Sequence, residues 1–118
     1  MQTKGQLEDT IGKAFIKFEK EFLGRGPEEI KTFILGDMIL IRLKGILTPA
    51  EQHLAATPEG KTLVKQVRVQ LIEKSRGLLE AIIKEITDHS VISLHTDIST
   101  TTGERVFIFV LDADITVE

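Results

Sequence analysis

The longest regular feature of this sequence is a helical pattern that runs from about Pro58 to Thr87. Its main apolar stripe is expected at Leu63, Val67, Leu71, Leu78, Ile82 and Ile86. About thirty residues at about 1.5 Å each give a helix about 45 Å long. A compact chain of 118 residues is about one domain and is narrower than such a helix. We therefore expect the helix either to kink at Gly77 or to project and pack on a second chain.

The part of the chain before this helix predicts a helix, a hairpin and a second, short helix. Residues 5–23 form an amphipathic pattern that stops at Gly24, and 30–35 and 38–44 are strand-like runs joined by Gly36-Asp37. A capping box begins at Thr48 and predicts a short helix to about residue 56. The inward stripe of the first helix is expected to contain Leu7, Ile11, Ala14, Phe15, Phe18 and Phe22, with Glu19 on the wet side.

Two strands complete the pattern. Residues 90–99 alternate, so that Ile92, Leu94 and Ile98 share one face, whereas in the strand 105–111 the run 106–111 is apolar on both faces. The order α-β-β-α-α-β-β predicts an α+β fold with a four-stranded, mostly antiparallel sheet and helices mainly on one face. We expect a single domain over residues 1–118, with its core at about 5–112. The overlong helix and the doubly apolar last strand together predict a homodimer.

Composition excludes several classes of function. The chain has no Cys, Trp or Tyr, which excludes disulfides and thiolate chemistry. Its six Phe lie in apolar patterns typical of a core, which argues against a stacking platform for nucleic acid. The net charge is −3 and no Lys/Arg cluster exists, so no nucleic-acid partner is expected. The N-terminus lacks a signal-peptide pattern, and no apolar run approaches the roughly 20 residues of a membrane span. We therefore expect a cytoplasmic protein without a membrane span.

The candidate site is a polar face of the strand 90–99. It carries Ser93, His95, Asp97 and Ser99, and the basic residues Arg42, Lys44 and Arg105 are expected near it in the sheet. For His95, a hydrogen bond to Asp97 or to a neighbouring strand is one interpretation, and a pocket for a small anion or a protein partner is the other. Arg25 lies in Gly-Arg-Gly-Pro, which is interpreted as a turn or as a loop that offers an anion contact.

Catalytic and cofactor chemistry is not expected from this face. Residues two apart on a strand lie about 6.5–7 Å apart, whereas a Ser/His/Asp triad needs successive hydrogen bonds near 3 Å. The three His residues lie on separate predicted elements, so no metal site is expected, and no phosphate-binding glycine loop is present. The sequence therefore predicts no cofactor, and it favours a protein without enzymatic activity.

Three blocks of the sequence carry a resemblance to a known family. They are 24–30 (GRGPEEI), 35–51 (LGDMILIRLKGILTPAE) and 93–105 (SLHTDISTTTGER). In this order they resemble the MpsC-like family, a small bacterial family that is also labelled as accessory to a Na-translocating system. The resemblance covers about residues 5–112 and implies an association with a membrane system that supports membrane potential, cation movement and inorganic-carbon uptake.

Two classes of function remain open. The first is a non-enzymatic accessory or regulatory module of a membrane ion or bicarbonate uptake system, which binds a partner or a small anion through Arg25, Arg42, His95 and Asp97. The alternative is an enzyme or a ligand sensor that acts on a small anionic molecule at the His95/Asp97 face.

Overall fold

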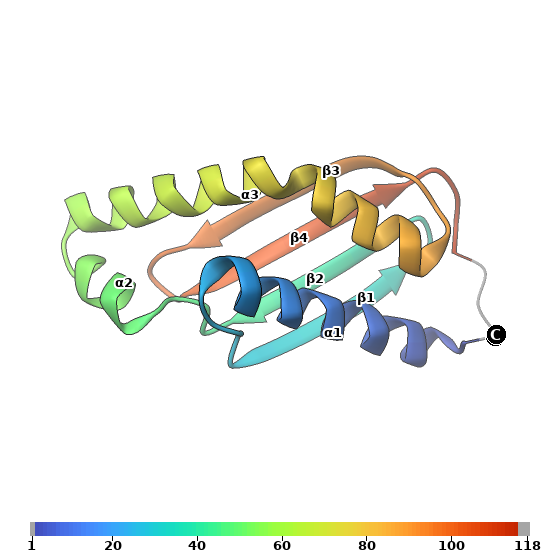
Figure 1. Cartoon of the computed structure of the whole chain (residues 1–118), viewed down its shortest axis with the longest axis horizontal. Coiled ribbons are helices and arrows are strands. Elements are labelled where there is room, and N and C mark those ends of the chain that lie inside the picture. Colours follow the sequence, from blue (N-terminus) through green and yellow to red (C-terminus); the bar gives the residue numbers. More distant parts are fainter. Residues whose placement is uncertain (1, 116–118) are drawn as a thin grey trace.

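A computed structural model describes residues 2–115 as a sheet with two long helices on one of its faces (Figure 1). The elements are α1 (Lys4–Leu23), β1 (Glu29–Leu35), β2 (Met38–Lys44), α2 (Pro49–Leu54), α3 (Pro58–Thr87), β3 (Val91–Ser99) and β4 (Glu104–Leu111). The strands lie in the order β1-β2-β4-β3, and every neighbouring pair is antiparallel. The predicted α+β fold and its element order are confirmed.

Helix α1 begins and ends where local chemistry requires. Thr3 and Gln6 form a capping box at its start, and Gly24 ends it with a left-handed φ of 91° that a side chain would disfavour. In the predicted apolar stripe, Leu7, Ile11, Phe15 and Phe18 are buried and Ala14 is partly buried. Two positions were predicted wrongly, because Phe22 is exposed whereas Glu19 is fully buried.

Helix α3 runs without interruption along the long axis of a molecule that measures 47 × 24 × 22 Å. It does not break at Gly77. Its N-terminal end extends past the end of the sheet, where α2 folds back beside it (Figure 1). This close approach depends on Gly60, because a Cβ at that position would lie 1.6 Å from the Leu54 carbonyl oxygen.

The apolar stripe of α3 that the sequence predicts is displaced by one residue. The buried positions are Gly60, Val64, Arg68, Ile72, Leu79 and Ile83, whereas Leu63, Val67, Leu71 and Leu78 are exposed. The two sets have the same helical spacing and differ by about 100° around the axis. The buried stripe contains Arg68, whereas the neighbouring stripe is entirely apolar. The sequence pattern therefore favoured the neighbouring stripe, and this prediction is wrong.

The sheet has one face packed on the helices and one that no described element of the chain covers. Ile39, Ile41 and Leu43 of β2 and Phe107 and Phe109 of β4 point into the helix-covered core and are fully buried. Strand β3 has a register shift between Val91 and Ser93. This irregularity leaves Ile92 exposed, although alternation had predicted it to lie on the same face as Leu94.

Candidate functional site

The face of the sheet opposite the helices, which we call the open face, carries most of the predicted site residues. Antiparallel partners point to the same side of a sheet, so the strand registers define the face as rows across four strands. One row is Leu35, Met38, Val110 and Ser93, the next is Phe33, Leu40, Ile108 and His95, and the third is Lys31, Arg42, Val106 and Asp97. Glu29 and Lys44, and Glu104 and Ser99, are paired at the end of the face nearest α2.

The half of the open face next to the β1–β2 turn is apolar. Phe33, Leu35 and Met38 are exposed by 41%, 49% and 38%, and Leu40, Ile108 and Val110 between them are half-buried. In an antiparallel sheet that faces water, the outward positions are expected to be polar. Six adjacent apolar side chains therefore form a contiguous apolar patch at positions where polar side chains are expected.

The other half of the open face carries charges of both signs. Arg42 donates to Glu104, with Nη2 and Oε2 2.8 Å apart, and Lys44 and Lys31 both lie within 4 Å of Glu29. The hydrogen bond with Glu104 raises the pKa of Arg42. Three cations and three anions occupy this half, counting Asp97, so it has no net charge and no unpaired cation ready for an anion.

His95 and Asp97 share the open face but do not contact one another. The His95 Nε2 atom lies 3.1 Å from the Ser93 hydroxyl oxygen. Asp97 accepts a hydrogen bond from the Ile98 amide, which lowers its pKa, and it pairs with Lys65 of α3 at 3.3 Å. Ser93 and His95 are therefore within hydrogen-bond distance of each other, but Asp97 contacts Ile98 and Lys65 instead of His95, so these three residues do not form a Ser/His/Asp triad.

The structure brings five of the predicted site residues to the open face and separates the other two. Arg42, Lys44, His95, Asp97 and Ser99 lie on it. Arg105 lies on the helix-covered face, fully buried, where it donates to the Thr96 hydroxyl at 2.8 Å and stacks over the Phe107 ring. Arg25 donates to the Leu47 carbonyl oxygen at 3.0 Å and so ties the loop after α1 to the segment before α2.

A cluster of buried charges at the α2 end of the core was not foreseen from the sequence. Burial raises the pKa of Glu19 to about 7, although the nearby Arg68 and Arg105 lower it, and burial lowers the pKa of Arg105 to about 10. Arg68 donates to Glu51 of α2 (Nε to Oε2, 2.7 Å) and to the Ile46 carbonyl oxygen. Burial by itself would raise the pKa of Glu51, but the hydrogen bonds from Arg68 and from the Thr48 amide hold it below its usual value.

A signal for this cluster exists in the helical spacing. Glu19 lies four residues after Phe15 on the stripe of α1, and Arg68 lies midway between Val64 and Ile72. The sequence pattern placed Glu19 on the wet side and gave no position for Arg68, and charged side chains are almost never fully buried unless paired.

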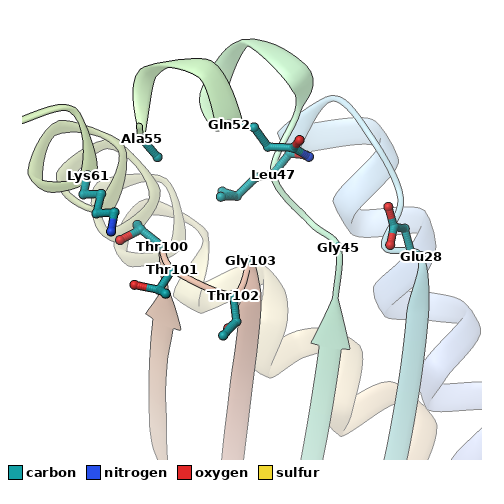
Figure 2. Close-up of a pocket in the computed structure, with 10 residues that line it drawn as sticks. All are labelled: Glu28, Gly45, Leu47, Gln52, Ala55, Lys61, Thr100, Thr101, Thr102 and Gly103. Atoms are coloured by element: carbon teal, nitrogen blue, oxygen red, sulfur yellow. The ribbon is translucent and has the colours of Figure 1, made fainter. Parts of the chain in front are cut away.

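A pocket of about 360 Å³ opens at the same end of the molecule, between α2, the β3–β4 loop and the start of α3 (Figure 2). Lys61 extends from the first turn of α3 towards Thr100 and Thr101. Within the described residues 2–115, its amine forms no hydrogen bond or ion pair. The pocket has the size and the polar lining for a small molecule, and no predicted site residue lines it.

Residues 2–115 contain no cluster of three or more metal-ligating side chains. None of the helices in this part of the chain combines the length and the hydropathy that crossing a bilayer requires.

Comparison with known proteins agrees with the resemblance carried by the three sequence blocks. The family model described as "Na+-translocating membrane potential-generating system (MpsC)" matches residues 3–113. The chain is similar to "Uncharacterized protein YbcI" of Bacillus subtilis (strain 168), with 46% identity over 114 residues that cover 97% of this chain and 92% of that protein. It is also similar to "Uncharacterized protein YrhF" of the same strain, with 35% identity over 101 residues that cover 84% and 82% of the two chains. No solved structure matches it.

Proposed function

Because the chain belongs to the MpsC family, we propose that it is a non-enzymatic accessory or regulatory subunit of a Na⁺-translocating, membrane-potential-generating system. It acts as a homodimer in the cytoplasm and binds the membrane-embedded part of that system.

The observation that carries this proposal is the presence of two exposed apolar surfaces on opposite sides of the molecule. The apolar half of the open face is one. The other is a groove of about 400 Å³ on the outer side of the helix layer, lined by residues of α1 and α3 alone. Its apolar lining consists of Ala14, Phe18, Phe22, Leu78, Ile82 and Ile86. A small domain with two such surfaces is suited to joining two partners.

The two surfaces have different occupants in this proposal. The second copy of the chain covers the open face, where Arg42, Lys44, His95, Asp97 and Ser99 contribute polar contacts. A segment of the membrane system binds in the groove between α1 and α3, with its apolar side chains against Phe22 and Leu78. Lys17, Glu21 and Glu85 at the groove provide polar contacts for the ends of that segment.

The test is purification of the tagged protein from detergent-solubilised membranes of its native cell, with the retained membrane proteins quantified by mass spectrometry. We expect subunits of a cation-translocating complex to be retained by the wild type and reduced at least tenfold by Phe22→Glu. Val69→Glu, which changes an exposed apolar residue of α3 outside the groove, is the control. Recovery of no such subunit with the wild type, together with an unchanged membrane potential in cells that lack the protein, would reject the function.

A second candidate function is the sensing of a small anion in the pocket at the α2 end. It is favoured by Lys61, whose amine has no partner within residues 2–115 and faces the Thr100–Thr101 loop (Figure 2). Thermal-shift measurements with bicarbonate, phosphate and small carboxylates test it, since a bound anion raises the melting temperature. A rise that Lys61→Ala abolishes and Lys65→Ala retains supports sensing, and no rise with any anion rejects it.

A further inference from the structure

The open face combines features that suit a copy of itself. Its apolar half has six side chains that no described element covers, and its charged half has equal numbers of positive and negative groups. A face that meets its own copy must be self-complementary, because both partners present the same patch. Resting on the homodimer in the proposed function, we propose that the open faces of two chains pack together about a two-fold axis that runs parallel to the strands, between β2 and β4.

The strand order determines what this axis brings together. A rotation about it reverses the order β1-β2-β4-β3 and keeps each residue at its level along the strands. Leu40 then lies opposite Ile108 of the partner subunit, and Met38 lies opposite Val110 of the partner subunit. The apolar half of one chain therefore covers the apolar half of the other.

The same rotation places opposite charges against each other. Lys31 on the β1 edge comes opposite Asp97 on the β3 edge of the partner subunit, because both are at the level of Arg42 and Val106. At the next level, Lys44 comes opposite Glu104 of the partner subunit. An axis perpendicular to the strands would instead place the apolar half on the charged half and leave buried charges facing apolar side chains, which is unfavourable.

The size of the face is sufficient for a specific dimer. Four strands about 4.8 Å apart and about eight residues at about 3.3 Å each give roughly 500 Å² of flat area per copy. Two copies bury roughly 1,000 Å² before side-chain relief is added, which reaches the lower limit for a specific interface. Two sheets packed this way lie about 10 Å apart with their mean strand directions within about 30° of each other, and the helices of both copies remain on the outside.

Light scattering after size exclusion at micromolar concentration tests the dimer and its location. We expect the mass of two chains for the wild type and of one chain for Met38→Glu, with unchanged circular dichroism. Leu63→Glu, an exposed apolar residue on the helix side, should remain a dimer. A monomeric wild type, or a Met38→Glu protein that remains dimeric, would overturn the proposal.

A charge exchange tests the direction of the axis. Lys31→Glu and Asp97→Lys each place like charges together across the interface and should each raise the dimer dissociation constant about tenfold. The two changes combined should restore it to within about twofold. If the double variant dissociates as readily as two independent tenfold effects predict, the two residues are not opposite each other and the proposed axis is wrong.

Cross-linking gives an independent measure of the same geometry, because the chain has no Cys of its own. Phe33 and His95 lie at the same level on opposite edges, so each faces the other across the axis. A mixture of Phe33→Cys and His95→Cys proteins should cross-link with a short bismaleimide. Phe33→Cys alone should not, because its two copies are separated laterally by about 14 Å. Cross-linking of Phe33→Cys alone, without cross-linking of the mixture, would overturn the proposed axis.

These outcomes are separable from those of the proposed function. If the wild type dimerises through the open face but retains no cation-translocating subunit, the accessory function is wrong and the interface stands. If it retains the subunit as a monomer, the interface is wrong and the accessory function stands.

Discussion

At the end of the core beside the β1–β2 turn, α1 and the sheet meet through aromatic and aliphatic side chains, whereas at the α2 end they meet through buried charges. Phe15 packs edge-on against Phe107 and Phe109, with ring centroids 5.3 and 5.7 Å away. At the α2 end the same layer contains Glu19, Arg68 and Arg105. The first end gains free energy of folding from burial without specific partners, whereas the second can form only with one arrangement of α1, α2 and α3.

This difference predicts that the two ends of the core respond differently to substitution. Apolar side chains tolerate replacement if volume is retained, whereas a buried charge without its partner is strongly destabilising. Both the pocket of Figure 2 and the overhanging part of α3 lie at the charged end. The following changes test the contrast in order of their expected effect.

Removing an aromatic ring from the apolar end should have the largest effect. Phe109→Ala deletes a fully buried side chain that contacts Phe15 and should lower the free energy of unfolding by about 4 kcal/mol. Urea denaturation of the two proteins measures the difference. A loss below about 1 kcal/mol would mean that the aromatic cluster does not hold this end.

The charged end should be recognised by its pH dependence. The pKa of Glu19 is raised from 4.5 to about 7 in the folded chain, so folding retains a proton that the unfolded chain releases. Stability therefore falls as the pH rises from about 4.5 to about 7 and is constant above that range, with a total loss of about 3 kcal/mol. The facing groups are Arg68 of α3, Arg105 of β4 and Glu51 of α2.

Urea denaturation at pH 5 and pH 8 measures this effect, with Glu19→Gln as the comparison. The amide cannot titrate, so the difference in unfolding free energy between wild type and variant isolates Glu19 from the other ionisable groups. We expect the free energy of unfolding of Glu19→Gln to increase relative to that of the wild type between pH 5 and pH 8. Equal pH profiles would show that Glu19 is ionised in the folded chain at both pH values.

The contact of α2 with α3 should tolerate no added methyl group. Gly60→Ala places a Cβ against the Leu54 carbonyl oxygen and should destabilise the protein by about 2 kcal/mol as α2 shifts. Gly77→Ala is the matched control in the same helix, because nothing lies within 4 Å of its Cβ. It should stabilise the protein by about 0.5–1 kcal/mol through helix propensity, measured in the same thermal unfolding series.

The smallest effect is expected at the loop beside the pocket. Arg25→Ala removes one hydrogen bond to the Leu47 carbonyl oxygen and should lower the free energy of unfolding by about 1 kcal/mol. Arg25→Lys, which retains the charge but not the planar guanidinium, separates the two contributions. If the lysine variant is as stable as the wild type, charge near Glu28 is what stabilises the loop.

Much of the fold followed from patterns along the chain. The stripe of α1 up to Phe18, the turn at Gly36-Asp37 and the capping box at Thr48 are local signals, and each marks an element that the structure contains. The polar alternation of β3 likewise brought His95, Asp97 and Ser99 to one face of the sheet. The bulge that exposes Ile92 was not predicted, because no residue type near it indicates a bulge.

What the sequence by itself determined is therefore the set of elements and the α+β class, since capping, turn geometry and periodicity act within a few residues. Tertiary structure decided which of the two adjacent stripes of α3 is buried, because the choice depends on Glu51 and Ile46 being in place to receive Arg68. It also separated Arg105 from Arg42: Arg42 is paired with Val106, and Arg105, the residue before Val106 on β4, points to the opposite face because consecutive residues of a strand alternate. The strand order β1-β2-β4-β3, on which the self-complementary charges of the open face depend, is a property of the assembled sheet and of no single segment.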